Sequence, residues 1–159
     1  MGKRLTAKGV KPICPYHHKF ENTYLFGAFS PITGASFMLE LPYCNSLTFQ
    51  LFLDEFTIER PTELKIMFLD NGAFHKAKGL KIPDNIILVF LPPYSPELNP
   101  AEKVWWVLKR EINLQVFKSL KELQIYLDKI IKKVINEESI RRLTSYEEYT
   151  TTFRTVMDL

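Results

Sequence analysis

Two acidic residues, Asp70 and Glu102, occur where carboxylates are suited to binding a metal ion. Asp70 directly follows the mostly apolar run KIMFL, and Glu102 ends the proline-rich run PPYSPELNPAE at residues 92–102. KIMFL forms one predicted strand, and the proline-rich run directly follows another. In open α/β sheets, ligands bind beyond the carboxyl ends of the strands. We therefore expect both carboxylates to reach one edge of a sheet. Magnesium prefers hard oxygen ligands and often takes one or two carboxylates, so the pair predicts a magnesium site.

Glu102 also has a purely structural explanation. Three prolines in the run restrict the backbone and bias the residues before them away from α geometry, so we expect residues 92–98 to form a rigid connection without helix. Asn99 is a suitable N-cap, Pro100 suits the first helical position, and Glu102 falls where a capping-box glutamate stands. The residues alone leave open whether Glu102 caps a helix, binds a metal ion or does both.

The elements that must position these residues follow an α/β order. The expected ranges are 24–30 and 35–41 for two strands of a hairpin, 46–59 for a helix capped by Ser46, 65–69 and 86–91 for two strands, 73–78 for a short helix, and 100–114 and 119–136 for two further helices. The later two strands are continuous apolar runs, which is typical of strands covered on both faces. Residues from Ile140 onward are expected to form a packed extension.

Composition favours one domain and gives modest information about partners. A chain of 159 residues with 46% hydrophobic content can bury about two-thirds of its unfolded surface. The net charge of +3 is only weak support for a polyanionic partner. Basic residues gather in the first twenty positions and in the C-terminal third, where acidic residues such as Glu111 and Asp128 interleave. That pattern is as typical of a solvated helix face as of a surface that follows phosphates.

Cysteine usage indicates a reduced setting. Cys14 and Cys44 are isolated and form no CxxC pair. Cys14 stands near His17 and His18, but a second pair of ligands at a usable spacing is missing, which argues against zinc. The sequence shows neither a signal peptide nor a segment long enough to cross a bilayer. We therefore expect a cytoplasmic protein with no membrane partner.

Two motifs in order resemble a known family. LDNGAFHK at residues 69–76, followed by LPPYSPELNPAEKVWWVLKRE at residues 91–111, is similar to the second half of the catalytic domain of DDE transposases in the Tc/mariner superfamily, in its bacterial insertion-sequence branch. GVKPICP and YLFGAFSPITG extend the resemblance more loosely, so that it covers most of residues 3–135. The resemblance implies an RNase H-like fold, a mixed sheet flanked by helices. It also implies cleavage and joining of DNA at transposon ends with Mg²⁺ or Mn²⁺.

The resemblance also implies roles for individual residues. Asp70 would be the second acidic metal ligand and Glu102 the third, and both would be catalytic. His75 would orient a water molecule or contact a phosphate, with a structural hydrogen bond as an equal alternative. The further expected DNA contacts are Lys76, Lys109 and Arg110. Lys109 stands seven residues after Glu102 and hence on about the same helix face.

The neighbouring Trp105 and Trp106 are expected to divide their roles. One should pack on the sheet and the other should lie nearer the site, since adjacent helical residues point in different directions. Stacking on a DNA base ranks behind core packing as a role for either ring.

The chain departs from the family pattern near its start. The family's first catalytic aspartate lies on the first, central strand, upstream of the segment similar to residues 9–15, and no aspartate precedes Asp54. We therefore expect residues 1–159 to form a single partial DDE catalytic domain, with a core at about 20–136, a C-terminal extension at 137–159, and no central strand. Without that strand the N-terminal residues fill the gap, the sheet splits, or a second chain pairs there.

The missing aspartate bears on activity. Two-metal phosphoryl transfer needs two ions clamped close together, and Asp70 with Glu102 would provide one weak magnesium site at most. We expect the chain alone to be inactive unless an upstream reading-frame product or a second copy of the chain supplies the strand and its aspartate. The alternative is a non-catalytic RNase H-like module that binds DNA or dimerises.

Overall fold

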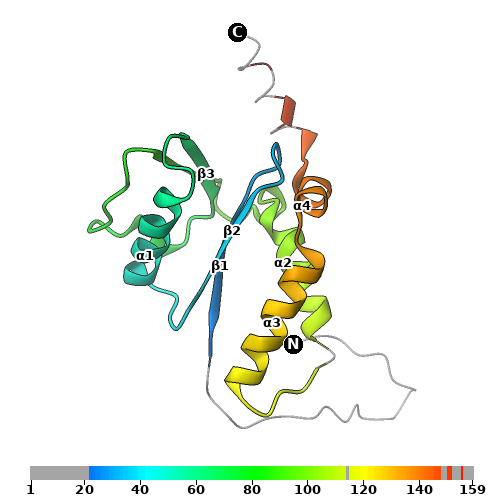
Figure 1. Cartoon of the computed structure of the whole chain (residues 1–159). Helices are drawn as coiled ribbons and strands as arrows, with labels where there is room; N and C mark the ends of the chain where they lie inside the picture. Colours follow the sequence, from blue (N-terminus) through cyan, green and yellow to red (C-terminus); the bar gives the residue numbers. More distant parts are fainter. Residues whose placement is uncertain (1–21, 114, 148–149, 152–154, 156–159) are drawn as a thin grey trace.

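The structure is a computed structural model that describes residues 22–113, 115–147, 150–151 and 155. These residues form a mixed α/β fold with two small sheets and four α-helices (Figure 1). The basic N-terminal segment and the group of Cys14, His17 and His18 lie outside the described residues. None of the described helices is both long and apolar enough to cross a membrane.

The predicted hairpin is confirmed. Strand β1 (Tyr24–Phe29) pairs antiparallel with β2 (Ser36–Leu41). The turn between them contains Gly34, whose φ of 78° suits a residue without a side chain. A Cβ atom there would also lie 2.2 Å from the carbonyl oxygen of Glu137, so the turn packs closely against the start of the last described α-helix.

Helix α1 (Ser46–Ile58) follows the hairpin as predicted, but its cap is different. Asn45 is the N-cap, and its Oδ1 accepts a hydrogen bond from the backbone N–H of Thr48 at 3.0 Å. The Thr48 hydroxyl accepts one from the Asn45 backbone N–H at 3.1 Å, which completes a capping box. The prediction of Ser46 as the cap was therefore wrong by one residue.

The next two strands also occur where the sequence predicted them. Strand β3 (Lys65–Leu69) and strand β4 (Ile86–Phe90) pair in parallel. The crossover between them contains the short 3-10 helix η1 (Ala73–Lys76), at the place where a short helical piece was expected.

The C-terminal half is helical. Its helices are α2 (Ala101–Ile112), α3 (Leu120–Val134) and α4 (Glu137–Thr144). A further 3-10 helix, η2 (Pro96–Leu98), lies in the proline-rich connection, so the prediction that residues 92–98 contain no helix was wrong. Proline is compatible with the first position of a helical turn, which is where Pro96 stands.

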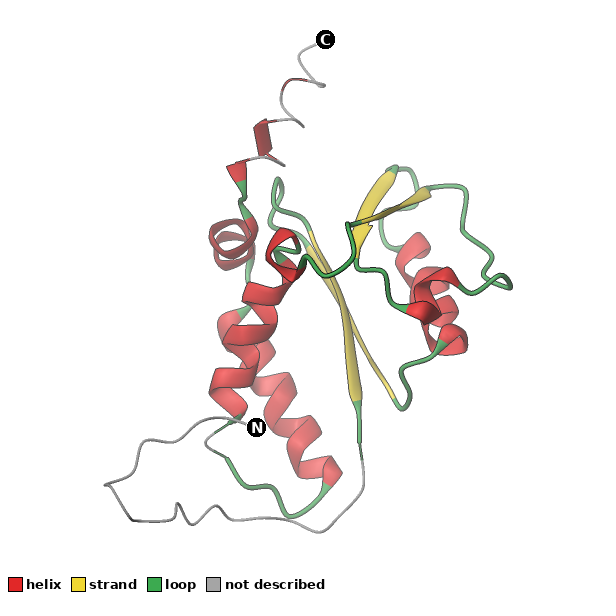
Figure 2. Ribbon diagram, turned by 180° about the vertical axis from the view of Figure 1, so that it is seen from behind, coloured by secondary structure: helices red, strands yellow, loops and turns green. Residues whose placement is uncertain are grey.

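The core has two parts on opposite sides of the hairpin (Figure 2). On one side, α1 packs against both sheets in a cluster of buried side chains: Leu41, Phe49, Phe52, Leu53, Leu69 and Ile86. On the other side α2, α3 and α4 bury Val104, Leu108, Leu127, Ile130 and Ile140 against one another and against the hairpin. The hairpin thus has helices on both faces.

The β3–β4 pair has a helix on one face only. Ile66 and its register partner Ile87 lie on the face away from α1, and the two residues are 56% and 45% exposed. The prediction that these strands are covered on both faces was therefore wrong, because α2 packs over the hairpin instead. In the part of the chain that the structure describes, no ladder joins β3–β4 to β1–β2, so the strands form two sheets and not one mixed sheet. The split sheet is one of the three arrangements expected from the sequence.

Candidate metal and DNA site

Asp70 is the first residue after β3 and its side chain is 69% exposed. Its Oδ1 accepts a hydrogen bond from the backbone N–H of Gly72 at 3.0 Å, as in many Asx turns. The same oxygen lies 3.3 Å from Nε2 of His75. Oδ1 is therefore held from two directions while much of the carboxylate remains open to solvent.

His75 is largely buried, with 13% of its side chain exposed. Its ring lies against Phe49 of α1 and against Phe74, with centroids 4.4 Å and 4.0 Å away. Burial lowers the pKa of His75, and the charge of Asp70 opposes that shift with a smaller effect. Its Nδ1 is buried and has no hydrogen-bond partner among the residues described. This environment suits a neutral ring that positions Asp70 better than one that contacts a DNA phosphate.

Asn71 ties the ends of the two parallel strands together, a role that the sequence analysis missed. Its side-chain amide donates a hydrogen bond to the carbonyl of Leu91. The backbone N–H of Leu91 donates to the carbonyl of Leu69 at 2.9 Å. Asp70 and the proline-rich connection therefore leave the sheet at the same edge, as the strand order predicted. The sequence signal that could have indicated this role is an asparagine directly after the aspartate that ends a predicted strand.

Glu102 lies in the first turn of α2 and is exposed. The N-cap of α2 is Pro100, which provides no side-chain cap, so the prediction of Asn99 as the N-cap and Pro100 as the first helical residue was wrong by one residue. The Asn99 side chain still accepts a hydrogen bond from the backbone N–H of Ala101 at 3.1 Å. The Glu102 side chain does not complete a capping box: within residues 22–113, 115–147, 150–151 and 155 its carboxylate has no hydrogen bond or ion pair. The capping explanation for Glu102 was therefore wrong, and the carboxylate is available to a ligand.

Glu102 lines an open hollow of about 350 Å³ together with Lys103, Trp106 and Lys109. The helical spacing of these residues places them on one face of α2, as predicted for Lys109. The two tryptophans divide as expected. Trp105 packs edge-on against Phe29 of β1 at 5.3 Å between ring centroids, whereas Trp106 is 60% exposed.

The two remaining cations predicted to contact DNA lie against aromatic rings. Arg110 places its guanidinium 4.9 Å from the centre of the Trp106 ring and also lies 3.6 Å from Glu111. Lys76 places its ammonium 5.0 Å from the centre of the Phe90 ring, beside the end of β4. Arg110 thus belongs to the surroundings of the hollow, while Lys76 lies on the β3–β4 side.

The predicted site residues form two groups. Asp70 lies with His75, and Glu102 lies with the cations of α2. Among the residues that are described, no group of three or more histidine, cysteine, aspartate or glutamate side chains could hold a metal ion, and no contact joins Asp70 to Glu102. The chemistry of the donors suits magnesium, since two exposed carboxylates leave coordination positions for phosphate and water.

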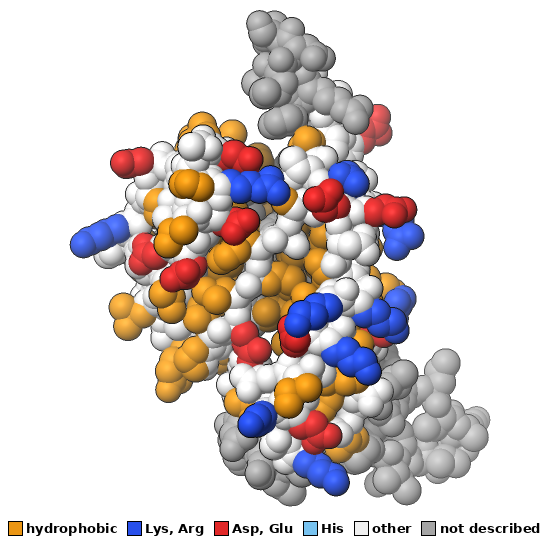
Figure 3. Space-filling view, viewed as in Figure 1, with side chains coloured by type: hydrophobic (Ala, Val, Ile, Leu, Met, Phe, Trp, Pro, Cys, Tyr) orange, Lys and Arg blue, Asp and Glu red, His pale blue; other side chains and the backbone are white. Residues whose placement is uncertain are grey.

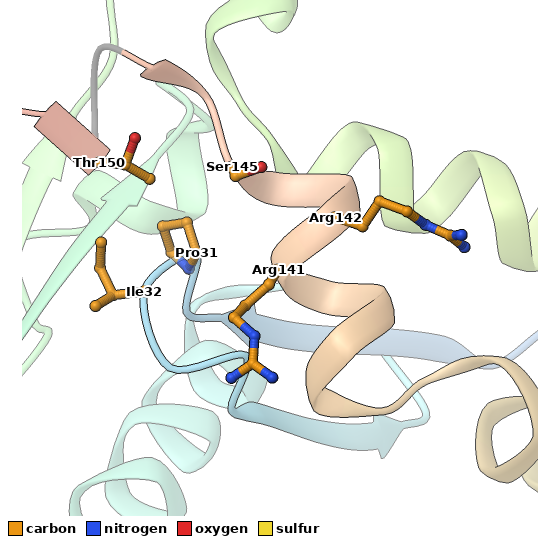
Figure 4. Close-up of a pocket in the computed structure, with 6 residues that line it drawn as sticks. All are labelled: Pro31, Ile32, Arg141, Arg142, Ser145 and Thr150. Atoms are coloured by element: carbon orange, nitrogen blue, oxygen red, sulfur yellow. The ribbon is translucent and has the colours of Figure 1, made fainter.

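A second hollow, of about 310 Å³, lies between the hairpin turn and the end of α4 (Figure 4). It contains two arginines, but they point in different directions. Arg141 donates a hydrogen bond to the carbonyl of Thr33 at 2.8 Å and lies 3.8 Å from Glu137. Its guanidinium thus already has acceptors, and we assign no ligand to this hollow.

Basic side chains are spread over the helical side of the molecule, with acidic ones between them (Figure 3). Lys132, for example, pairs with Asp128 at 2.7 Å. Lys103 and Lys109, like several other lysines, form no ion pair with any described residue. They are the lysines that line the hollow beside Glu102.

Comparison with known proteins gives a consistent result. The family model described as DDE superfamily endonuclease matches residues 2–124. A protein of Sinorhizobium fredii (strain NBRC 101917 / NGR234), named as the uncharacterized protein y4pE/y4sA, is 36% identical over 118 residues, which cover 72% of this chain and 86% of that protein. No solved structure matches the chain.

Proposed function

This chain belongs to the DDE superfamily endonucleases, and from that membership we propose that Asp70 and Glu102 are catalytic carboxylates of a transposase that cleaves and joins DNA at transposon ends. The observation that supports this most is the free carboxylate of Glu102, which neither caps its helix nor pairs with a cation in the described structure. We also propose, from the resemblance of the motifs around both residues, that the protein belongs to the bacterial insertion-sequence branch of the Tc/mariner superfamily.

The proposed cofactor is Mg²⁺ or Mn²⁺, held by Asp70 and Glu102. A bound divalent ion supplies charge stabilisation for phosphoryl transfer. The chain's own residues have complementary roles. His75 holds the Oδ1 side of Asp70 from a buried position, Asn71 fixes the strand end beside it, and Lys109 contacts a DNA phosphate near Glu102.

We further propose that the site is completed by a strand from a partner, which brings a third carboxylate. Two features support this. The two sheets lie against the same helix α1 without a ladder between them in the described residues, and unpaired strand edges accept further strands. The uncovered face at Ile66 and Ile87 is also unusual for a parallel pair, which is normally buried on both sides. An upstream reading-frame product is the proposed partner, with a second copy of the chain as the alternative.

A plasmid assay tests this function. The full chain is incubated with supercoiled plasmid and Mg²⁺ or Mn²⁺, alone and with the upstream product. We expect nicking with the partner only, and we expect Asp70→Asn and Glu102→Gln to abolish it. Glu97→Gln, in the same connection, is the matched control and should remain active. Nicking by the chain alone that Asp70→Asn abolishes would overturn the partner requirement. Absence of nicking under every condition would overturn the cleavage function.

The second candidate function is a non-catalytic module that binds DNA or dimerises. The observation that favours it is that the described residues hold no group of three metal-ligating side chains. It differs from the first candidate in one measurable respect, since it predicts DNA binding or dimerisation that divalent metal leaves unchanged.

A further inference from the structure

Trp106 is an exposed aromatic ring surrounded by cations, directly beside a proposed catalytic carboxylate. The residue is 60% exposed even though the guanidinium of Arg110 lies 4.9 Å from the ring centre. Its neighbour Trp105 is the ring that packs on the sheet, so the fold does not need Trp106 for that purpose. An exposed tryptophan of this kind is available to a ligand.

The surroundings of Trp106 define the chemistry of that ligand. Lys103 and Lys109 stand three residues before and three residues after it, and both line the same hollow. The ammonium of Lys103 is held 4.2 Å from the centre of the Tyr146 ring, which fixes one side of the hollow. A flat aromatic surface with positive charge on both sides suits a planar base flanked by phosphates.

We infer that Trp106 stacks an unpaired DNA base, with Lys103 and Lys109 contacting the phosphates on either side of that base. The ligand class is single-stranded DNA or a frayed duplex end, because a base within a duplex has both faces covered by its neighbours. This inference rests on the proposed function for the identity of the ligand as DNA. It assigns a substrate-binding role to Trp106, whose ring also lies beside the Arg110 guanidinium.

Comparing two oligonucleotides, one with bases and one without, distinguishes base stacking from simple phosphate binding. A labelled single-stranded oligonucleotide and an abasic oligonucleotide of the same length carry the same phosphates, but only the first has bases. Fluorescence anisotropy with the full chain in EDTA gives both affinities for wild type and for Trp106→Ala. EDTA removes divalent metal, so the result does not depend on cleavage or on Asp70.

The expected result is a base-dependent loss of affinity. Trp106→Ala should weaken binding of the normal oligonucleotide roughly 5- to 150-fold, the range for loss of one stacked base, and should change binding of the abasic one little. Trp106→Phe should retain part of the affinity, because it keeps an aromatic face. Tyr43→Ala removes an aromatic side chain of similar exposure, 65%, from the connection between β2 and α1 and should have no effect.

Three outcomes overturn the inference: wild type that binds neither oligonucleotide in EDTA, a Trp106→Ala variant that binds as wild type does, and a loss of equal size for both oligonucleotides. If the proposed cleavage function is wrong, the two assays give a different pattern of results. In that case plasmid nicking is absent, while the base-dependent effect of Trp106→Ala in EDTA remains.

Discussion

The Nε2 atom of His75 lies 3.3 Å from Oδ1 of Asp70, and the two side chains differ sharply in exposure, at 13% and 69%. The His75 ring is held by Phe49 from α1 and by the adjacent Phe74. A largely buried side chain therefore restrains a carboxylate that remains open to solvent. That arrangement is what a metal ligand needs, since a restrained carboxylate loses less freedom when it binds an ion.

The first prediction concerns pH. Burial lowers the pKa of His75 below its ordinary value of 6.5, so between the folded and unfolded pKa values the unfolded chain binds more protons. The free energy of unfolding should then fall as the pH decreases through 6.5 toward the folded pKa. His75→Gln removes this group and should flatten the dependence. Urea unfolding in EDTA over about pH 5–8 measures it. If the free energy of unfolding of His75→Gln depends on pH as that of wild type does, His75 is not the group responsible.

The second prediction concerns the contact between β1 and α2. A Cβ atom on Gly27 would lie 2.7 Å from Cη2 of Trp105 and 2.8 Å from Cζ of Phe29. Gly27→Ala should therefore reduce the free energy of unfolding by about 1–3 kcal/mol through overpacking. Gly79 has no atom within 4 Å of such a Cβ, so Gly79→Ala should be neutral or stabilise by up to about 1 kcal/mol. Urea midpoints followed by circular dichroism compare the two, and equal effects would show that Trp105 is not seated on Gly27.

The third prediction concerns the uncovered face of β3. Ile66→Asn should change the stability of the isolated chain by less than about 0.5 kcal/mol, because the side chain is exposed. Leu69→Ala, on the face toward α1, should cost about 2–5 kcal/mol. If a partner strand completes this region, Ile66→Asn should also reduce the gain in melting temperature that the partner produces. A large cost of Ile66→Asn in the isolated chain would mean that this face is already covered.

Much of the fold was accessible from the sequence, because its signals are local. The apolar segments at residues 24–30 and 35–41 and the turn around Gly34 specify the hairpin, and the run KIMFL specifies β3. Whether a helix packs on a given face of a strand is not determined by the local sequence. An apolar run reads the same whether or not a distant helix packs on its second face, so the exposure of Ile66 was not predictable. Adjacent Asn45 and Ser46 are both good caps, and the choice between them depends on Thr48 completing the box.

The site was predictable to a lesser extent. The motifs predicted Asp70 and Glu102 as candidate metal ligands, and the seven-residue spacing placed Lys109 on the face of Glu102. The burial of His75 comes from Phe49 on α1, a contact between distant segments that no local pattern contains. The fate of the Glu102 carboxylate likewise depended on geometry, since its position in the sequence suits a cap that the structure does not form.

The central claim is that Asp70 and Glu102 bind a divalent metal ion. Its most direct test is to titrate the full chain with Mn²⁺ in the presence of a DNA duplex and to measure the free ion by electron paramagnetic resonance. Asp70→Asn and Glu102→Gln should each weaken a saturable Mn²⁺ site by at least about tenfold, as expected for loss of a ligand. Glu97→Gln should bind as wild type does. Equal binding by all four proteins, or no saturable binding by any of them, would contradict the account.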